Sequence, residues 1–381
     1  MKIFDVEGIP GEKVFVHIDM FEYPHGTKEQ LPLAIIQGTM SGPILLLTGN
    51  IHGDELHGLV TVQEVIQGIN PKELKGTIIA IPTLNPAGLL TLTRSPFYDR
   101  SDPNRLWPNP KPKKEPKLKY EDPYDKNLDP LENPGVQEVF YTKLAEILPQ
   151  VDFFIDLHCH SFRSIPYSYI DRIYFDEKKE GEKEKAQELF NNTLEMVQAF
   201  GFTIVLEDPP RHYFRKDLHR STTGSFVNLQ RKPGFTVELG ASGIVDTDIT
   251  DAAKTGVFNI LKWAKMLEGE IEVVSSIPVL NNELWREIEI RVSQSGLYIP
   301  LVKTGELVNQ NDPIAVVHDI FGEAKETISA PENGTVMAFF DDIRCYPNKS
   351  IGSFLVKNTV DLILPWEYEK KEEEEKGVKE T

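Results

Sequence analysis

Two residues that can bind a metal, His52 and Glu55, directly follow an apolar run that ends at Gly49. Residues three apart lie on the same side of a helical turn, with Cβ atoms about 5–6 Å apart, so the imidazole and the carboxylate can reach one ion. Two ligands close in sequence and a third from elsewhere in the chain are common in catalytic zinc sites, where water takes the fourth position. On its own this spacing recurs by chance, and a capping acid beside a surface histidine is its more frequent explanation.

A second apolar run, VDFFIDLHCHS, carries Asp156, His158 and His160 at its polar end. Charged and imidazole groups beside a buried strand need partners, because burying them unpaired is costly. Ligands of open α/β sheets gather beyond the carboxyl ends of the strands, where His52 and His158 both emerge. We therefore expect His158 as the third ligand and Asp156, on the same strand face, as its hydrogen-bond partner. His57 and His160 are alternative ligands.

The elements that must position these residues alternate through the first two thirds of the chain. Several apolar runs are continuous, as expected for strands buried on both faces. The patterns predict strands over 13–21, 33–38, 44–49, 77–84, 151–158, 202–206 and 235–239, and helices over 56–69, 136–148, 182–200 and 248–267. This alternation predicts an α/β fold with a mixed β-sheet flanked by helices.

The remaining third has a different pattern. From Glu270 to Val356, short β runs are separated by turns, which predicts a small all-β module. Its pattern resembles a biotinyl/lipoyl-type half-barrel but lacks the modifiable lysine motif, so we expect a packing or oligomerisation role. The predicted division is a catalytic domain over 1–268 with a Pro- and Lys-rich surface insertion at 109–134, a β-rich module over 269–366, and a charged tail over 367–381.

Composition narrows the classes of function. The chain has 381 residues, with 41 Lys and Arg against 59 Asp and Glu, a formal charge of −18. A broadly acidic protein repels phosphate backbones, so nucleic acid is not an expected partner. The two cysteines, Cys159 and Cys345, exclude a disulfide framework. With neither a signal peptide nor a membrane-spanning run expected, the predicted compartment is the cytoplasm.

Five ordered motifs resemble the succinylglutamate desuccinylase/aspartoacylase family, a branch of the zinc carboxypeptidase-like hydrolases. They are His52-Gly-Asp-Glu55, Asn85-Pro86 with Arg94, Asn104-Arg105, Asp156-Leu-His158, and Val237-Glu238-Leu239-Gly240. The resemblance covers roughly residues 33–267 and implies one Zn²⁺ per chain, held by His52, Glu55 and His158. It also implies a homo-oligomer.

The resemblance assigns four further roles. Glu238 resembles the carboxylate that activates the attacking water and then protonates the leaving amine. Asn104 and Arg105 resemble the pair that binds a substrate carboxylate, and Arg94 resembles the arginine that polarises the scissile carbonyl. Zinc and a guanidinium can both stabilise the oxyanion that forms there. Without the resemblance, a capping or salt-bridged Glu238 would be the favoured interpretation.

The chain departs from the family at the segment that binds substrate. The family has Asp-Leu-Asn-Arg where this chain has Asp102-Pro-Asn104-Arg105, and Pro103 restricts the backbone there. Three arginines in the segment TRSPFYDRSDPNR suggest a site for anionic substrates, with ion pairing to Asp99 and Asp102 as the alternative. No clear counterpart exists for further substrate contacts, for which Arg163, Arg220 and Arg231 are candidates.

The leading hypothesis is a zinc-dependent amide hydrolase that removes an acyl group from an N-acyl amino acid or a similar small carboxylate-bearing substrate. A metallocarboxypeptidase acting on peptides is the second hypothesis. A non-catalytic metal-binding or sensor protein with the same fold is the third.

Overall fold

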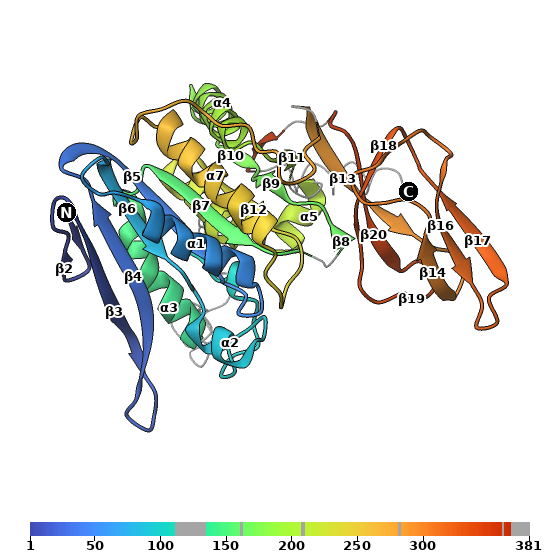
Figure 1. Cartoon of the computed structure of the whole chain (residues 1–381), viewed down its shortest axis with the longest axis horizontal. Helices are drawn as coiled ribbons and strands as arrows, with labels where there is room; N and C mark the ends of the chain where they lie inside the picture. Colours follow the sequence, from blue (N-terminus) through green and yellow to red (C-terminus); the bar gives the residue numbers. More distant parts are fainter. Residues whose placement is uncertain (111–134, 161–162, 207–209, 281–282, 360–361, 367–381) are drawn as a thin grey trace, which may run out of the picture.

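The computed structural model describes residues 1–110, 135–160, 163–206, 210–280, 283–359 and 362–366. One long mixed sheet runs through the molecule, and helices cover both of its faces over the first two thirds of the chain (Figure 1). The strand order is β15-β18-β20-β13-β11-β9-β12-β7-β5-β6-β4-β3. The predicted α/β architecture, a mixed sheet flanked by helices, is confirmed.

The strands and helices before residue 269 have the following bounds. The strands are β1 (Lys2–Ile3), β2 (Val6–Glu7), β3 (Glu12–Glu22), β4 (Lys28–Gln37), β5 (Met40–Gly49), β6 (Lys75–Ile81), β7 (Phe153–His158), β8 (Arg163–Ser164), β9 (Tyr167–Ile170), β10 (Ile173–Phe175), β11 (Thr203–Leu206) and β12 (Gly234–Glu238). The helices are α1 (Leu56–Gly68), α2 (Pro86–Thr91), α3 (Val136–Leu144), α4 (Glu182–Phe200), α5 (Pro210–Arg215), α6 (Thr222–Gln230) and α7 (Thr247–Trp263). Short 3-10 helices span Pro103–Arg105, Ala145–Gln150 and Leu218–Arg220.

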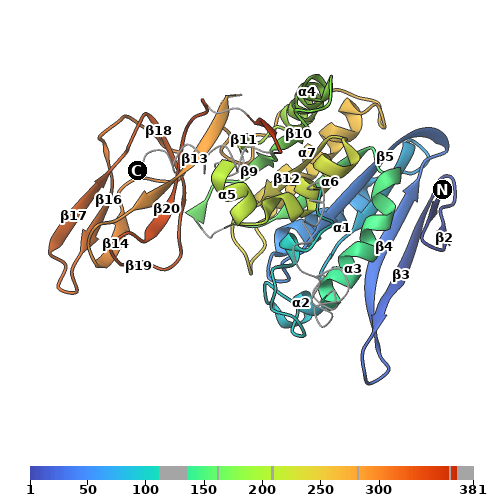
Figure 2. The same cartoon turned by 180° about the vertical axis from the view of Figure 1, so that it is seen from behind.

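The two faces of the sheet bury separate hydrophobic cores. Along β4, Ala34 and Ile36 contribute to the core under α1, α4 and α7, whereas Leu33 and Ile35 contribute to the core under α3 and α6. This is the period of two that a pleated strand imposes. Figures 1 and 2 show α1 and α7 on one side of the sheet and α3 and α6 on the other.

Three neighbouring strands end at the same edge of the sheet. β7 pairs in parallel with β5 on one side and with β12 on the other. Because parallel strands bring their carboxyl ends together, the residues that end or follow β5, β7 and β12 meet at one edge. His158 and Glu238 are register partners there.

The last third of the described chain contains strands and no helix, as expected. They are β13 (Leu284–Arg291), β14 (Gly296–Pro300), β15 (Leu307–Val308), β16 (Pro313–His318), β17 (Ala324–Ser329), β18 (Gly334–Phe339), β19 (Arg344–Cys345), β20 (Ser350–Lys357) and β21 (Ile363–Pro365). The sheet β17-β16-β14-β19 shares a hydrophobic core with strands that extend the long sheet. The likeness to a half-barrel stays a prediction.

Backbone pairing joins this module to the first two thirds at three places. β13 pairs in parallel with β11, β8 pairs with β18, and β21 pairs in parallel with β10. The long sheet therefore continues from one region into the other. The division of the chain at residue 268 stays a prediction.

Some element boundaries differ from the sequence expectations. The helix expected over 136–148 is α3 followed by a 3-10 helix that contains Pro149, a residue that cannot donate an α-helical hydrogen bond. The expected helix over 248–267 ends at Trp263. The short strands β9 and β10 and the polar helix α6 were not predicted. Most of the insertion (residues 111–134) and the charged tail lie outside the described residues.

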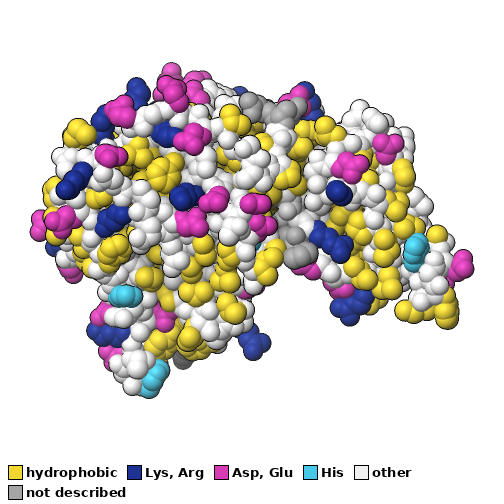
Figure 3. Space-filling model, in the orientation of Figure 1, with side chains coloured by type: hydrophobic (Ala, Val, Ile, Leu, Met, Phe, Trp, Pro, Cys, Tyr) yellow, Lys and Arg dark blue, Asp and Glu magenta, His cyan; other side chains and the backbone are white. Residues whose placement is uncertain are grey.

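On the face in Figure 3, basic side chains are interspersed with acidic ones and form no extended patch. No helix among the described residues is both long and apolar enough to cross a bilayer.

Candidate metal centre and substrate pocket

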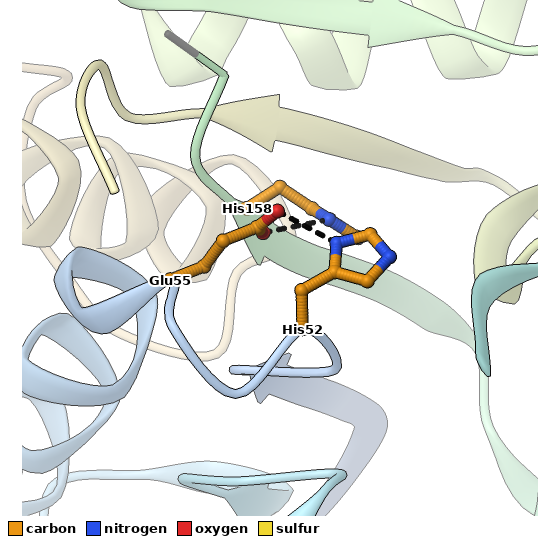
Figure 4. A group of neighbouring side chains, drawn as sticks. All are labelled: His52, Glu55 and His158. Carbon is orange, nitrogen blue, oxygen red and sulfur yellow. Dashed lines mark hydrogen bonds and ion pairs between the residues drawn. The ribbon is translucent and has the colours of Figure 1, made fainter. Parts of the chain in front are cut away.

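His52, Glu55 and His158 form a buried cluster at the edge where β5, β7 and β12 end (Figure 4). His52 Nδ1 lies 2.6 Å from Glu55 Oε1, and His158 Nδ1 lies 3.1 Å from Glu55 Oε2. One ligand atom from each of the three residues lies within 4.8 Å of the others. Each residue is 3% exposed. The structure thus brings together the three predicted ligands, two of which are more than a hundred residues from the third.

The His52–Glu55 pair lies in a turn, which corrects the expectation of a helical turn. The Glu55 N–H donates to the His52 carbonyl at 3.0 Å, and Glu55 is the N-cap residue of α1, which begins at Leu56. The turn lets both side chains face His158 across the end of β7. α1 packs closely against β7 at Gly58, where a Cβ atom would lie only 2.4 Å from the Leu157 carbonyl oxygen.

The side chain of Asn50 stabilises the turn by hydrogen bonds to its backbone. Its side-chain amide donates to the carbonyls of His52, Gly53 and Glu55 at 3.1, 3.1 and 2.9 Å. Its Oδ1 accepts the Thr83 hydroxyl at 2.7 Å. Asn50 has φ 55°, the left-handed region that asparagine tolerates better than most residues. One buried amide therefore fixes the backbone of both nearby ligands.

A carboxylate holds the outer nitrogen of each histidine. His158 Nε2 lies 2.7 Å from Asp156, which also accepts the hydroxyls of Thr48 and Thr222 at 2.6 Å each. His52 Nε2 lies 3.0 Å from Asp102. With Nε2 engaged, each imidazole turns Nδ1 toward the cluster, the arrangement that carboxylate partners give to metal-ligating histidines.

The electrostatics of the cluster suit a cation. Burial tends to lower the pKa of His158, but Asp156 and Glu55 outweigh it and raise that pKa well above its usual value. Burial likewise opposes ionisation of Glu55, yet His52 and His158 hold its pKa below the ordinary value. Glu55 and Asp102 likewise outweigh burial and raise the pKa of His52. Binding of a divalent cation would require both imidazoles to be neutral, because ligand histidines bind metals in that form.

Glu238 lies in the same pocket as the cluster. It ends β12, and its Oε2 is buried with no hydrogen-bond partner among the described residues. Burial raises the pKa of this carboxyl, despite the opposing influence of His158. The pocket has a volume of about 380 Å³ and is lined by all the predicted site residues except the buried Asp156, namely His52, Glu55, Arg94, Asn104, Arg105, His158 and Glu238.

The segment that carries Asn104 and Arg105 is a 3-10 helix capped by Asp102, whose side chain accepts the Asn104 N–H at 2.9 Å. Pro103 occupies the first helical position, where a proline fits without loss of a hydrogen bond. Asn104 Oδ1 accepts the Thr222 N–H at 2.9 Å, so its NH₂ group points away from α6. Pro103 is therefore compatible with both residues lining the pocket.

Arg94 is tied to the metal cluster through Asp102. Its Nη2 lies 2.8 Å from Asp102 Oδ2, while Asp102 Oδ1 contacts His52. Nη1 of Arg94 lies 3.7 Å from Glu55. Ion pairing of these arginines with Asp102, the alternative that the sequence suggested, is thus observed for Arg94, which lines the pocket.

The alternative residues have other partners. His57 Nε2 accepts the Asp246 N–H at 2.9 Å and its Nδ1 lies 3.5 Å from the Cys159 sulfur, so it faces away from the cluster. His160 lines the pocket but is not a member of the cluster. Arg220 pairs with Glu138 at 2.8 Å and Arg231 donates to the Tyr174 carbonyl at 2.8 Å. Among the described residues, neither these two arginines nor Arg163 lines the pocket.

Sequence reasoning missed several residues of the site. Asp102 contacts His52, and Asn50 holds the turn that carries His52 and Glu55; these groups form the metal side of the pocket. Phe340 of the C-terminal module lines the pocket together with Tyr169 and Leu218. Asp102 is part of the segment Asp102-Pro-Asn104-Arg105, and its carboxylate could have been predicted as the hydrogen-bond partner of a ligand histidine. Asn50, polar and directly after a buried strand, gave a weaker signal. Phe340 gave none, because it lies far along the chain in an ordinary β run.

Comparisons with known proteins agree with this architecture. Residues 41–264 match the model of the succinylglutamate desuccinylase/aspartoacylase catalytic domain. An N-alpha-acetyl-L-2,4-diaminobutyric acid deacetylase from Halomonas elongata is 22% identical over 314 residues, which cover 81% of this chain and 80% of that protein.

Two crystal structures share the fold over nearly the whole chain. One is a succinylglutamate desuccinylase/aspartoacylase from Rhodobacter sphaeroides, with a TM-score of 0.69, 20% identity, and coverage of 91% of this chain and 96% of that chain. The other is the product-bound ectoine utilization protein EutE (DoeB) from Ruegeria pomeroyi, with a TM-score of 0.68, 19% identity, and coverage of 92% and 98%.

Proposed function

The chain belongs to the succinylglutamate desuccinylase/aspartoacylase family, and on that premise we propose that it is a zinc-dependent amide hydrolase. It removes the acyl group from an N-acyl amino acid or a similar small substrate that carries a carboxylate. One observation carries this proposal: the buried Glu238 Oε2, which has no hydrogen-bond partner in the part of the chain that the structure describes, shares a pocket with the His52–Glu55–His158 cluster. The Halomonas relative, a deacetylase by name, is consistent with it.

His52, Glu55 and His158 would hold the zinc ion, with Asp102 and Asp156 orienting the imidazoles. Two imidazoles and one carboxylate are a donor set of catalytic zinc sites. Bound zinc lowers the pKa of a water molecule to about 7 and polarises a carbonyl.

Glu238 acts as the general base and acid. Its carboxylate accepts the proton of the attacking water and then delivers that proton to the nitrogen of the leaving amine. The raised pKa of Glu238 suits both steps, because a group that must accept and then release a proton works best with a pKa near the working pH.

Arg94 stabilises the negative charge that develops on the carbonyl oxygen. Asp102 orients its guanidinium at 2.8 Å, so the donor is in position before the reaction begins. Asn104 and Arg105 bind the carboxylate of the substrate, for which a guanidinium offers two parallel donors.

The size of the pocket supports a small substrate rather than a polypeptide. A volume of about 380 Å³ lies at the lower end of small-molecule sites, which enclose about 300–1,000 Å³. We therefore prefer deacylation to the carboxypeptidase hypothesis.

Replacement of the general base tests the mechanism. Glu238→Gln keeps the shape of the side chain but cannot accept the proton, so we expect kcat to fall by about 10²–10⁴-fold with zinc content and fold retained. Turnover is measured as amine release from N-acetyl, N-succinyl and longer N-acyl amino acids, and zinc by atomic emission. Glu195→Gln, on the exposed face of α4, is the matched control. A Glu238→Gln enzyme with the wild-type kcat would remove Glu238 from the mechanism.

A further inference from the structure

The two arginines that line the pocket, Arg94 and Arg105, differ in whether their guanidinium groups are already paired with a carboxylate. Arg94 already pairs with Asp102 at 2.8 Å and lies 3.7 Å from Glu55. Arg105 donates one Nη1 bond to the Asn104 carbonyl. In the described part of the chain no carboxylate forms an ion pair with it, although Asp102 and the buried Asp171 lie near enough for its charge to favour their ionised forms. One guanidinium is therefore available for one carboxylate of the substrate.

The rest of the polar lining disfavours a second negative charge. The carboxylates of Glu55 and Glu238 line the pocket, and those of Asp102 and Asp156 lie directly behind the two histidines. His160 also lines the pocket, and its ring packs against that of Tyr167 with 5.9 Å between the centroids. The charge of the proposed zinc ion would be opposed by Glu55 and by the carboxylates of Asp102 and Asp156 behind the two imidazoles. A second anionic group would be desolvated without a cation of its own, which is costly.

An apolar wall completes the pocket. It consists of Phe340, Leu218 and the ring of Tyr169, which come from the C-terminal module, the 3-10 helix before α6, and β9. The Tyr169 hydroxyl donates to Glu287 Oε2 at 2.7 Å, so the ring rather than the hydroxyl is offered to the pocket.

The wall is held rigidly. The Phe340 N–H donates to the Ile351 carbonyl at 3.0 Å, and the Phe340 carbonyl accepts the Tyr298 hydroxyl. β18, which precedes Phe340, pairs with β8 close to the end of β7 that carries His158. Phe340 thus directly follows a strand of the same sheet in which β5, β7 and β12 end at the candidate cluster.

From these contacts we infer that the substrate is an N-acyl amino acid with a single carboxylate and an uncharged, apolar variable group that packs on Phe340 and Leu218. This inference rests on the proposed function and specifies its substrate class. Compounds with a second carboxylate, in the side chain or in the acyl group, are excluded by charge.

Three N-acetyl amino acids with side chains of similar size and shape test the inference: leucine, asparagine and aspartate. We expect kcat/KM to fall in that order, with leucine about a hundredfold above aspartate, since an unpaired buried charge is far more costly than a lost apolar contact. The same order is expected for affinity, measured by calorimetry with the zinc-loaded Glu238→Gln protein. A preference for aspartate in either measurement overturns the inference.

Substitutions in the wall test which of its residues determine the preference for an apolar side chain. Phe340→Ala should lower kcat/KM for N-acetyl-leucine by about tenfold and for N-acetyl-glycine by clearly less, because glycine has no side chain to pack. Leu218→Ala, a second wall variant, should act in the same direction. Phe321→Ala, at a hairpin tip of the same module where Phe321 is 90% exposed, is the matched control. An equal loss for both substrates would make Phe340 structural and overturn its role.

The two proposals fail differently. Binding of N-acetyl-leucine without hydrolysis of any compound would overturn the amide hydrolase and leave the pocket preference standing. Hydrolysis with aspartate preferred would do the reverse. If none of the compounds binds or is hydrolysed, both proposals fall.

Discussion

The two sides of the pocket are built on different physical principles. On the metal side, each imidazole has a carboxylate on both of its nitrogens within about 3 Å, and Asn50 ties the intervening backbone together. On the other side, Phe340 and Leu218 offer shape and apolar area. Hydrogen bonds are directional and fix atoms precisely, whereas apolar contacts select by size and charge. Damage to the metal side should therefore lower activity toward all substrates alike, whereas damage to the wall should change the order in which substrates are preferred.

The largest effect is expected from loss of a ligand. His158→Ala removes one of three metal donors and leaves Asp156 buried without its partner, so zinc content and turnover of every substrate should both be lost. Treatment of the wild type with a chelator should have the same effect on turnover, and added zinc should restore it. Metal analysis and amine release are the measurements. A His158→Ala protein that binds as much zinc as the wild type would show that His158 is not a metal ligand.

A smaller effect is expected from the carboxylates behind the histidines. Asp102→Asn and Asp156→Asn should each weaken zinc binding by about 10–100-fold, because an amide orients an imidazole less strongly than a carboxylate does. Competition with a chromophoric chelator measures the affinity. Asp251→Asn on the exposed surface of α7 is the control.

These two variants should also differ from each other. Asp102 contacts both His52 and Arg94, while among these groups Asp156 contacts only His158. At saturating zinc, Asp102→Asn should therefore lower kcat more than Asp156→Asn does. Equal kcat values would show that Asp102 does not act through Arg94.

A third effect concerns the stability of the turn that carries His52 and Glu55. Asn50→Ala removes three hydrogen bonds to the turn and places alanine at φ 55°, so we expect unfolding to become easier by about 2–4 kcal/mol. Asn50→Gly removes the same hydrogen bonds but tolerates the backbone conformation, and should cost less. Chemical denaturation measures both. Neither variant should alter the ratio between leucine and aspartate substrates.

The smallest effect is expected at the edge of the wall. Glu287→Gln weakens the acceptor for the Tyr169 hydroxyl but leaves the ring in place, so the substrate ratio should change by no more than about threefold. Zinc affinity should be unaltered. A large drop in zinc affinity would show that the two sides of the pocket are coupled through β9 and β12.

The sequence predicted the parts of the molecule in which local pattern and global fold agree. The continuous apolar runs that became β5, β7 and β12 could be recognised because both of their faces are buried. The polar residues at the ends of these runs then predicted a candidate metal site, whose three residues lie together in the structure. β9 escaped prediction because its sequence, YSYI, lacks the continuous apolar run that revealed the equally short β11. α6 escaped because polar residues of TTGSFVNLQ are buried, so its pattern is not that of an amphipathic helix.

The remainder of the site depends on contacts between distant segments. Asp156 could be paired with His158 because the two residues share one strand face. Asp102 reaches His52 across 50 residues, and Phe340 reaches the pocket through the pairing of β18 with β8. No local pattern encodes such distances, since loop closure and strand order are set by the whole sheet.

The pairing of β21 with β10 has a consequence for biosynthesis. Ile363–Pro365 complete a two-stranded ladder whose other member, β10, leaves the ribosome almost two hundred residues earlier. During synthesis β10 therefore lacks this partner until residues almost two hundred positions later have been made, and Phe340 of the wall is likewise made well after His52, Glu55 and His158.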